Sequence, residues 1–131
     1  MVSDRLHLVR GAELSGATAQ TAGMNRRAAI SGDLVGASAI WMGQTHVAPG
    51  ATSGPHHHGH SETGIFVVSG HPVFIYREGA REVRLEAVPG DYVYIPPQVP
   101  HIESNEGSAE EAVVVIARTT QEAVVVNLES L

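Results

Sequence analysis

A chain of 131 residues with 43% apolar and 17% charged residues is long enough for one soluble domain with a single buried core. Its net charge of −6 argues against a surface for nucleic acids or anionic membranes, since both need a basic patch. The sequence has no lysine and no cysteine, which excludes Schiff-base chemistry, thiolate nucleophiles, disulfides and cysteine metal sites.

The N-terminal residues MVSDRLHLVRG lack the apolar run of a signal peptide. No segment approaches the roughly 20 apolar residues that a membrane span requires. A chain without disulfides can fold in a reducing compartment. We therefore expect a cytoplasmic protein without a membrane or nucleic-acid partner.

The chain divides into an irregular part and a regular part. Residues 1–38 predict an N-terminal arm, rich in small residues over 12–39, with one short strand around Arg27–Ile30. In residues 39–131, short β-branched or aromatic runs alternate with Gly and Pro turns, which predicts an all-β sandwich or closed barrel. The expected strands are 39–47, 56–58, 64–68, 73–77, 82–85, 92–95, 101–104, 112–118 and 123–128.

The most informative segment reads Gly-Pro-His-His-His-Gly-His-Ser-Glu over residues 54–62. Alternate residues of a strand share a face, so His56 and His58 point the same way and can chelate one ion, whereas His57 points away. Glu62 can return from a neighbouring strand after a turn, and His101 follows a Pro-rich turn later in the chain. Three imidazoles and a carboxylate suit one divalent ion of Zn, Fe, Mn, Ni or Cu.

Two spacings resemble the motifs of the cupin family. The first is Gly50, five residues, His56-x-His58, three residues, Glu62 and then Gly70 after seven residues, one more than the family pattern has. The second is Gly90, five residues, Pro96-x-Gln98, two residues, His101, three residues and Asn105, with Gln98 in place of the usual glycine. The resemblance covers about residues 39–118. It implies a double-stranded β-helix, or jelly-roll barrel, with His56, His58, Glu62 and His101 as ligands of one metal ion.

Two alternatives to this ligand set follow from the residues. Counted back from Gly70, Thr63 stands at the glutamate position, but a hydroxyl is the poorer ligand, so Glu62 is expected. Pairing His58 with His60 would leave Glu62 too close in sequence to turn and return. His60 is expected in the turn, either solvated or at the mouth of the site.

Five residues are candidates for a substrate pocket. If Glu62 faces the interior, alternation places Phe66 on the same wall. Either Trp41 or Met42 faces inward, and Tyr94 or Tyr92 could donate a hydrogen bond to a substrate. Arg26 and Arg118 are the two cations that a carboxylate or phosphate group would need.

The resemblance implies a small-molecule metalloenzyme. Small cupins include dioxygenases, which act on enol or catechol-like substrates, and isomerases or tautomerases, which act beside a carbonyl. Glu62 would then double as the catalytic proton acceptor. The alternative is a non-catalytic metal- or ligand-binding module. Small cupins usually pair as homodimers, and the arm could reach across to a partner.

Overall fold

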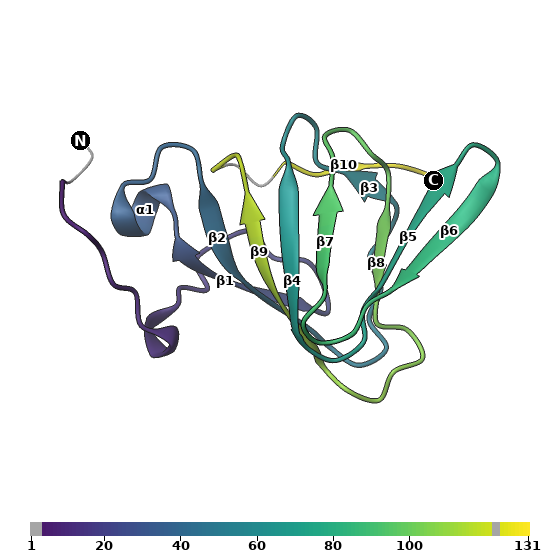
Figure 1. The fold of residues 1–131 in the computed structure, drawn as a ribbon, viewed down its shortest axis with the longest axis horizontal. Coiled ribbons are helices and arrows are strands. Elements are labelled where there is room, and N and C mark those ends of the chain that lie inside the picture. The colour runs from purple at the N-terminus through teal and green to yellow at the C-terminus, as the bar shows by residue number, and fades with distance from the viewer. Residues whose placement is uncertain (1–3, 122–123) are drawn as a thin grey trace.

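The computed structural model describes residues 4–121 and 124–131 and is built almost entirely from strands (Figure 1). The strands are β1 (Met24–Ile30), β2 (Trp41–Val47), β3 (His56–His57), β4 (Thr63–Ser69), β5 (Val73–Glu78), β6 (Arg81–Glu86), β7 (Tyr92–Ile95), β8 (Ile102–Ser104), β9 (Ala112–Arg118) and β10 (Val126–Asn127). In the described part of the chain, no helix has the length and apolar character to cross a membrane.

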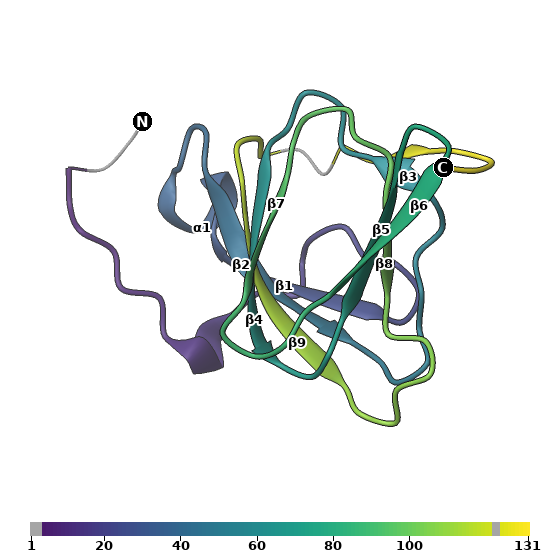
Figure 2. The same cartoon turned by 45° about the vertical axis from the view of Figure 1, so that its right-hand side comes forward.

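The strands form two facing sheets, which Figure 2 shows nearly edge-on. The larger sheet has the order β1-β2-β9-β4-β7, with all neighbours antiparallel. The smaller has the order β6-β5-β8. Strands β3 and β10 form a separate pair, which an isolated bridge between His56 and His101 joins to the chain just before β8. This is the predicted all-β, double-stranded β-helix fold.

The core lies between the two sheets and fills one end of the space that they enclose. Alternation along β4 buries Ile65 and Val67, which pack with Phe74 of β5 and Val114 of β9. Val67 and Val114 are fully buried. The other end of the space remains open as a cavity with both apolar and polar lining, described below.

The arm contributes more regular structure than its composition indicates. The strand expected at Arg27–Ile30 begins at Met24 and forms the edge of the larger sheet against β2. A one-turn helix, α1 (Gly32–Val35), and a 3-10 turn, η1 (Gly11–Glu13), were not predicted. Both are too short for a periodic pattern to show. The predicted last strand, 123–128, is shorter as β10, and residue 123 lies outside the described residues.

The turn before His101 keeps its geometry without the glycine of the family pattern. Gln98 has a φ of 66° and donates its backbone N–H to the Gly59 carbonyl at 2.8 Å. A left-handed φ strains any residue with a Cβ. We therefore expect Gln98→Gly to raise the free energy of unfolding by about 0.5–1 kcal/mol in urea titrations. Gln98→Ala, which keeps the Cβ, should match the wild type, and a loss of stability in the glycine variant would contradict this account.

Candidate metal centre

Three histidines from two separate segments meet on the wall of the cavity. His56 and His58 come from β3 and the residue after it, and His101 lies just before β8. Reciprocal backbone hydrogen bonds between His56 and His101, at 3.1 and 2.9 Å, hold the segments together. The three rings lie 4.5–5.0 Å apart between centroids. One potential ligand atom from each lies within 4.8 Å of the others, a spacing that one metal ion can bridge.

Each imidazole is oriented by a backbone carbonyl. Nδ1 of His56 donates to the Gly54 carbonyl at 2.8 Å, and Nδ1 of His101 donates to that of Val99 at 3.0 Å. Nδ1 of His58 donates to the Val124 carbonyl at 2.9 Å. Since a carbonyl only accepts, each Nδ1 carries the proton and each Nε2 keeps its lone pair for a metal. Metal-ligating histidines usually have such a second partner, which fixes tautomer and ring orientation.

The surroundings keep the imidazoles neutral. Burial lowers the pKa of His101 from 6.5 to about 4, and its backbone hydrogen bond offsets only part of that effect. Burial likewise lowers the pKa of His56 and His58, and the positive charge of Arg26 adds to the effect. The neutral form is the one that binds a metal, so the site is ready at pH 7. The donor set, its orientation and its protonation state all fit a divalent ion.

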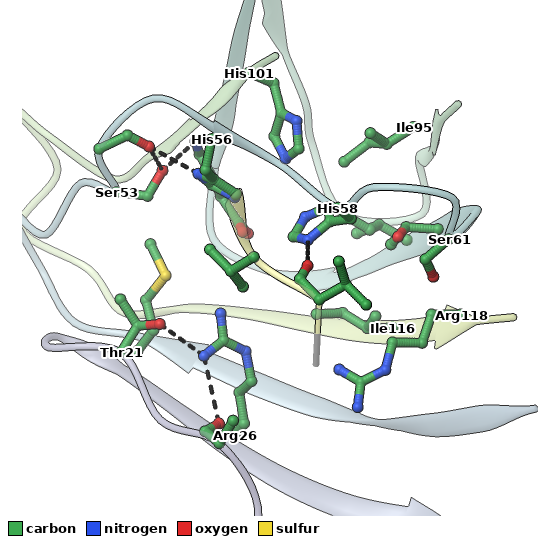
Figure 3. Close-up of a pocket in the computed structure, with 18 of the residues that line it drawn as sticks. Thr21, Arg26, Ser53, His56, His58, Ser61, Ile95, His101, Ile116 and Arg118 are labelled. Atoms are coloured by element: carbon green, nitrogen blue, oxygen red, sulfur yellow. Dashed lines mark hydrogen bonds between the residues drawn. The ribbon is translucent and has the colours of Figure 1, made fainter. Parts of the chain in front are cut away.

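The histidines line a cavity of about 430 Å³ between the sheets (Figure 3). Its size is typical of small-molecule sites. The walls combine apolar side chains, Ile65, Ile95, Ile116 and Val124, with a few polar and charged groups. Arg26 of β1 and Arg118 at the end of β9 lie across the cavity from the imidazole rings.

The structure does not bring Glu62 to the three histidines, which corrects the predicted four-ligand set. Its side chain is exposed, and its carboxylate accepts a hydrogen bond of 2.7 Å from the Tyr94 hydroxyl. Thr63, Ile65 and Val67 form the buried face of β4, so Glu62, one residue before this strand, points to the opposite face. Thr63, the alternative at this position, is buried and lines the cavity.

Two of the candidate pocket residues, Phe66 and Tyr94, likewise lie outside the cavity. Phe66 contacts the ring of Tyr92 at 4.8 Å between centroids, and Tyr94 is 59% exposed. Neither lines the cavity, so their expected places in the pocket are corrected. Trp41 is buried but lies behind the wall, where its ring supports Arg118 at 4.1 Å from the guanidinium carbon.

Glu103 was not predicted from the sequence, and it alone among the described lining residues brings a carboxyl group to the cavity. Its Oε1 is fully buried and has no hydrogen-bond partner in the described part of the chain. Burial raises the pKa of this carboxyl to about 7, against the opposing effect of Arg26. The signal was present, because Glu103 stands two residues after His101 and alternation puts both on one face.

The buried carboxyl predicts a pH-dependent gain of stability in Glu103→Gln. An unfolded glutamate titrates near 4.5 and the folded one near 7, so the stability contributed by Glu103 is present below pH 4.5 and lost as pH rises through 7. In chelator-treated protein at pH 8, we expect the amide variant to be more stable by about 2 kcal/mol, with the gain absent at pH 4.5.

Urea titrations at both pH values measure this difference, in which the histidine contributions cancel between wild type and variant. Glu106→Gln, a change at an exposed glutamate three residues on, is the matched control and should stay within about 0.5 kcal/mol of wild type. Equal stability of Glu103→Gln and wild type at pH 8 would argue against a buried carboxylate.

The two other histidines of the cluster lie outside the group of three. His57 is half-buried, and its Nδ1 accepts a hydrogen bond from the Gly59 backbone at 3.0 Å. His60 is exposed in the turn before β4. Both can therefore serve as control positions for the metal site.

Comparisons with known proteins identify the family. The cupin domain family matches residues 43–117, which is more than half of the chain and holds all three histidines. No curated protein matches.

Several solved structures have a similar fold. The polyketide cyclase RemF from Streptomyces resistomycificus is 19% identical, with a TM-score of 0.76, over 95% of this chain and 86% of that one. An oxalate oxidase in complex with the substrate analogue glycolate is 25% identical, with a TM-score of 0.59, over 68% of this chain. The match spans 46% of that oxidase, about half its length. An oxalate decarboxylase from Bacillus subtilis, described with Mn(II) centres, is 17% identical with a TM-score of 0.69, and the match covers 83% of this chain and 29% of that one. The matched motifs, the facing sheets and the three converging histidines together show that this chain belongs to the cupin family.

Proposed function

We propose that this protein is a metal-dependent enzyme that acts on an enolisable or carbonyl small molecule, as a dioxygenase or as an isomerase or tautomerase. The observation that carries the proposal is the convergence of three imidazoles, each held through Nδ1 by a carbonyl, on a cavity of about 430 Å³. His56, His58 and His101 would hold one divalent ion of Zn, Fe, Mn, Ni or Cu.

A bound ion would supply Lewis acidity, and redox capacity if it is iron, manganese, nickel or copper. The chain itself performs the other tasks. The backbone carbonyls fix the imidazoles before a substrate arrives, and the isoleucines and Val124 exclude water from one side of the cavity. Because Glu62 lies on the outer face, it is not placed to accept a proton from a molecule in the cavity.

The similar structures support the proposal of an enzyme that acts on small molecules. The oxalate oxidase, at 25% identity, was solved with glycolate, which is a small hydroxy acid. The decarboxylase with Mn(II) centres and the polyketide cyclase are similar in fold. The fold alone does not select a reaction, so the substrate class has to come from the cavity itself.

The test combines elemental analysis of untagged protein with a turnover screen. We expect about one metal ion per chain, together with consumption or isomerisation of a diketone, catechol, flavonol or sugar acid. Oxygen uptake separates the dioxygenase from the isomerase. Protein without stoichiometric metal would overturn the proposal, and metal without any turnover would instead favour a non-catalytic binding module.

Two further expectations concern the whole protein. We propose a homodimer, because exposed side chains of the larger sheet, among them Tyr92 at 80% and Tyr94 at 59%, offer an outer face for association. Size-exclusion chromatography at micromolar concentration tests this, and a monomer would contradict it. A cytoplasmic location is likewise a proposal, and fractionation of cells that express the protein would test it.

A further inference from the structure

Two arginines occupy the side of the cavity opposite the histidines (Figure 3). Both are half-buried, and burial lowers the pKa of Arg26 and lowers that of Arg118 to about 10. The positive charge of Arg26 contributes to the shift at Arg118, as expected for two guanidinium groups that share one space. Like charges in a partly desolvated cavity are unfavourable without an anion between them.

The protein supplies little negative charge to offset this pair. Neither arginine forms a salt bridge within residues 4–121 and 124–131. Glu103 is close enough to influence Arg26 electrostatically, but its buried Oε1 makes no hydrogen bond to the described residues. Two guanidinium groups against one carboxyl leave the lining with a net positive charge.

Hydrogen bonds to the chain fix each guanidinium but leave part of it available. Nη1 of Arg26 donates to the Thr21 hydroxyl at 2.8 Å and lies 3.5 Å from the Ala19 carbonyl. Nε and Nη2 of Arg118 donate to the carbonyls of Thr120 and Gln121, each at 3.0 Å, while the ring of Trp41 supports the group from behind. In the described chain no hydrogen bond uses Nε or Nη2 of Arg26 or Nη1 of Arg118, so each group keeps donors for a ligand.

Resting on the proposed function, we infer that the substrate is an organic carboxylate whose carboxyl group is bound between Arg26 and Arg118 while its carbon skeleton extends toward the histidines. Two oxygens match the two partly used guanidinium groups. The apolar part of the cavity lining, which includes Ile65, Ile95 and Ile116, suits a carbon skeleton better than a free phosphate.

Trp41 makes binding measurable without any reaction. It is the only tryptophan in the chain, and it contacts the guanidinium that would hold the ligand. The experiment titrates cyclohexanecarboxylate into the 131-residue chain, as purified and again after chelation, with tryptophan fluorescence and calorimetry as readouts. Cyclohexanecarboxamide, of similar size but uncharged, is the matched ligand, and inorganic phosphate is the third probe.

We expect saturable binding of the carboxylate to both forms of the protein, and binding of the carboxamide weaker by about 10-fold or more. Arg26→Gln and Arg118→Gln should each weaken carboxylate binding by a similar factor. Arg26→Gln leaves the contact between Arg118 and Trp41 intact, so its fluorescence response is the cleaner one. Arg84→Gln, at an exposed arginine of β6, should bind as the wild type does.

Equal binding of carboxylate and carboxamide would overturn the inference, as would unchanged binding in both arginine variants or no saturable binding at all. Phosphate that binds more tightly than the carboxylate would overturn it in favour of a phosphate site. Because the chelated protein is also titrated, a failure of the metal proposal does not affect this result. If the protein as purified holds no stoichiometric metal and still binds the carboxylate, the ligand site stands while the enzyme proposal fails.

Discussion

Replacing His101 with alanine is expected to abolish stoichiometric metal binding. The side chain is 5% exposed, and its ring lies 4.5 Å from that of His56 and 5.0 Å from that of His58, between centroids. Removing one imidazole leaves two protein ligands, so we expect an affinity loss of at least about 100-fold, since the loss of a mere supporting group costs 10–100-fold. Competition of Zn²⁺ between the protein and a chromophoric chelator measures the change.

His101→Ala also removes a buried side chain from the fold, so metal loss in this variant alone could reflect unfolding. His56→Ala and His58→Ala, at half-buried positions, are therefore tested beside it and should lose metal in the same way. His57→Ala is the matched control within the same segment, and Glu62→Gln tests the carboxylate that lies outside the group. Both should keep the wild-type affinity. Loss of metal in Glu62→Gln, or its retention in all three alanine variants, would contradict the proposed centre.

The second large effect is expected at Asn105, whose side chain joins two loops at the closed end of the molecule. The residue is 1% exposed, and its amide nitrogen lies 3.3, 3.1 and 2.8 Å from the carbonyls of Val47, Ala48 and Glu110. Asn105→Ala removes the amide that joins the three carbonyls, leaving those of Ala48 and Glu110 only their local donors, Ala51 N–H and the Ser108 hydroxyl, and it creates a small cavity. We expect the free energy of unfolding in urea to fall by about 3 kcal/mol.

Two variants separate the hydrogen bonds from the packing. Asn105→Asp keeps the shape but replaces the donor with an acceptor, so it should destabilise the protein at least as much as alanine does. Asn25→Ala, at an exposed asparagine of β1, should change stability by no more than about 0.5 kcal/mol. Wild-type stability in Asn105→Asp would show that the amide does not hold the loops.

Most of the fold could be predicted from local signals. The paired turn residues and the alternation of apolar residues predicted the strands from β2 to β9 within a few residues, because both signals act over short distances. The three histidines could be predicted for the same reason. His56 and His58 share a face by alternation, and the family spacing placed His101 beside them.

The rest of the site depends on contacts that no local pattern encodes. Glu62 follows a turn, and its backbone N–H donates to the Thr119 hydroxyl at 3.0 Å, so the far end of β9 helps determine which way its side chain points. The carbonyl that orients His58 comes from Val124, 66 residues later in the chain. The placement of Arg26 opposite the histidines required β1 to join the larger sheet, which the composition of the arm did not indicate.

The central claim is a metal ion held by three histidines, and anomalous diffraction from crystals grown with Mn²⁺ tests it most directly. The predicted result is one strong anomalous peak per chain, within bonding distance of Nε2 of His56, His58 and His101 and distant from the Glu62 carboxylate. A peak bound to Glu62, a peak elsewhere on the chain, or no peak at these three imidazoles would contradict the claim.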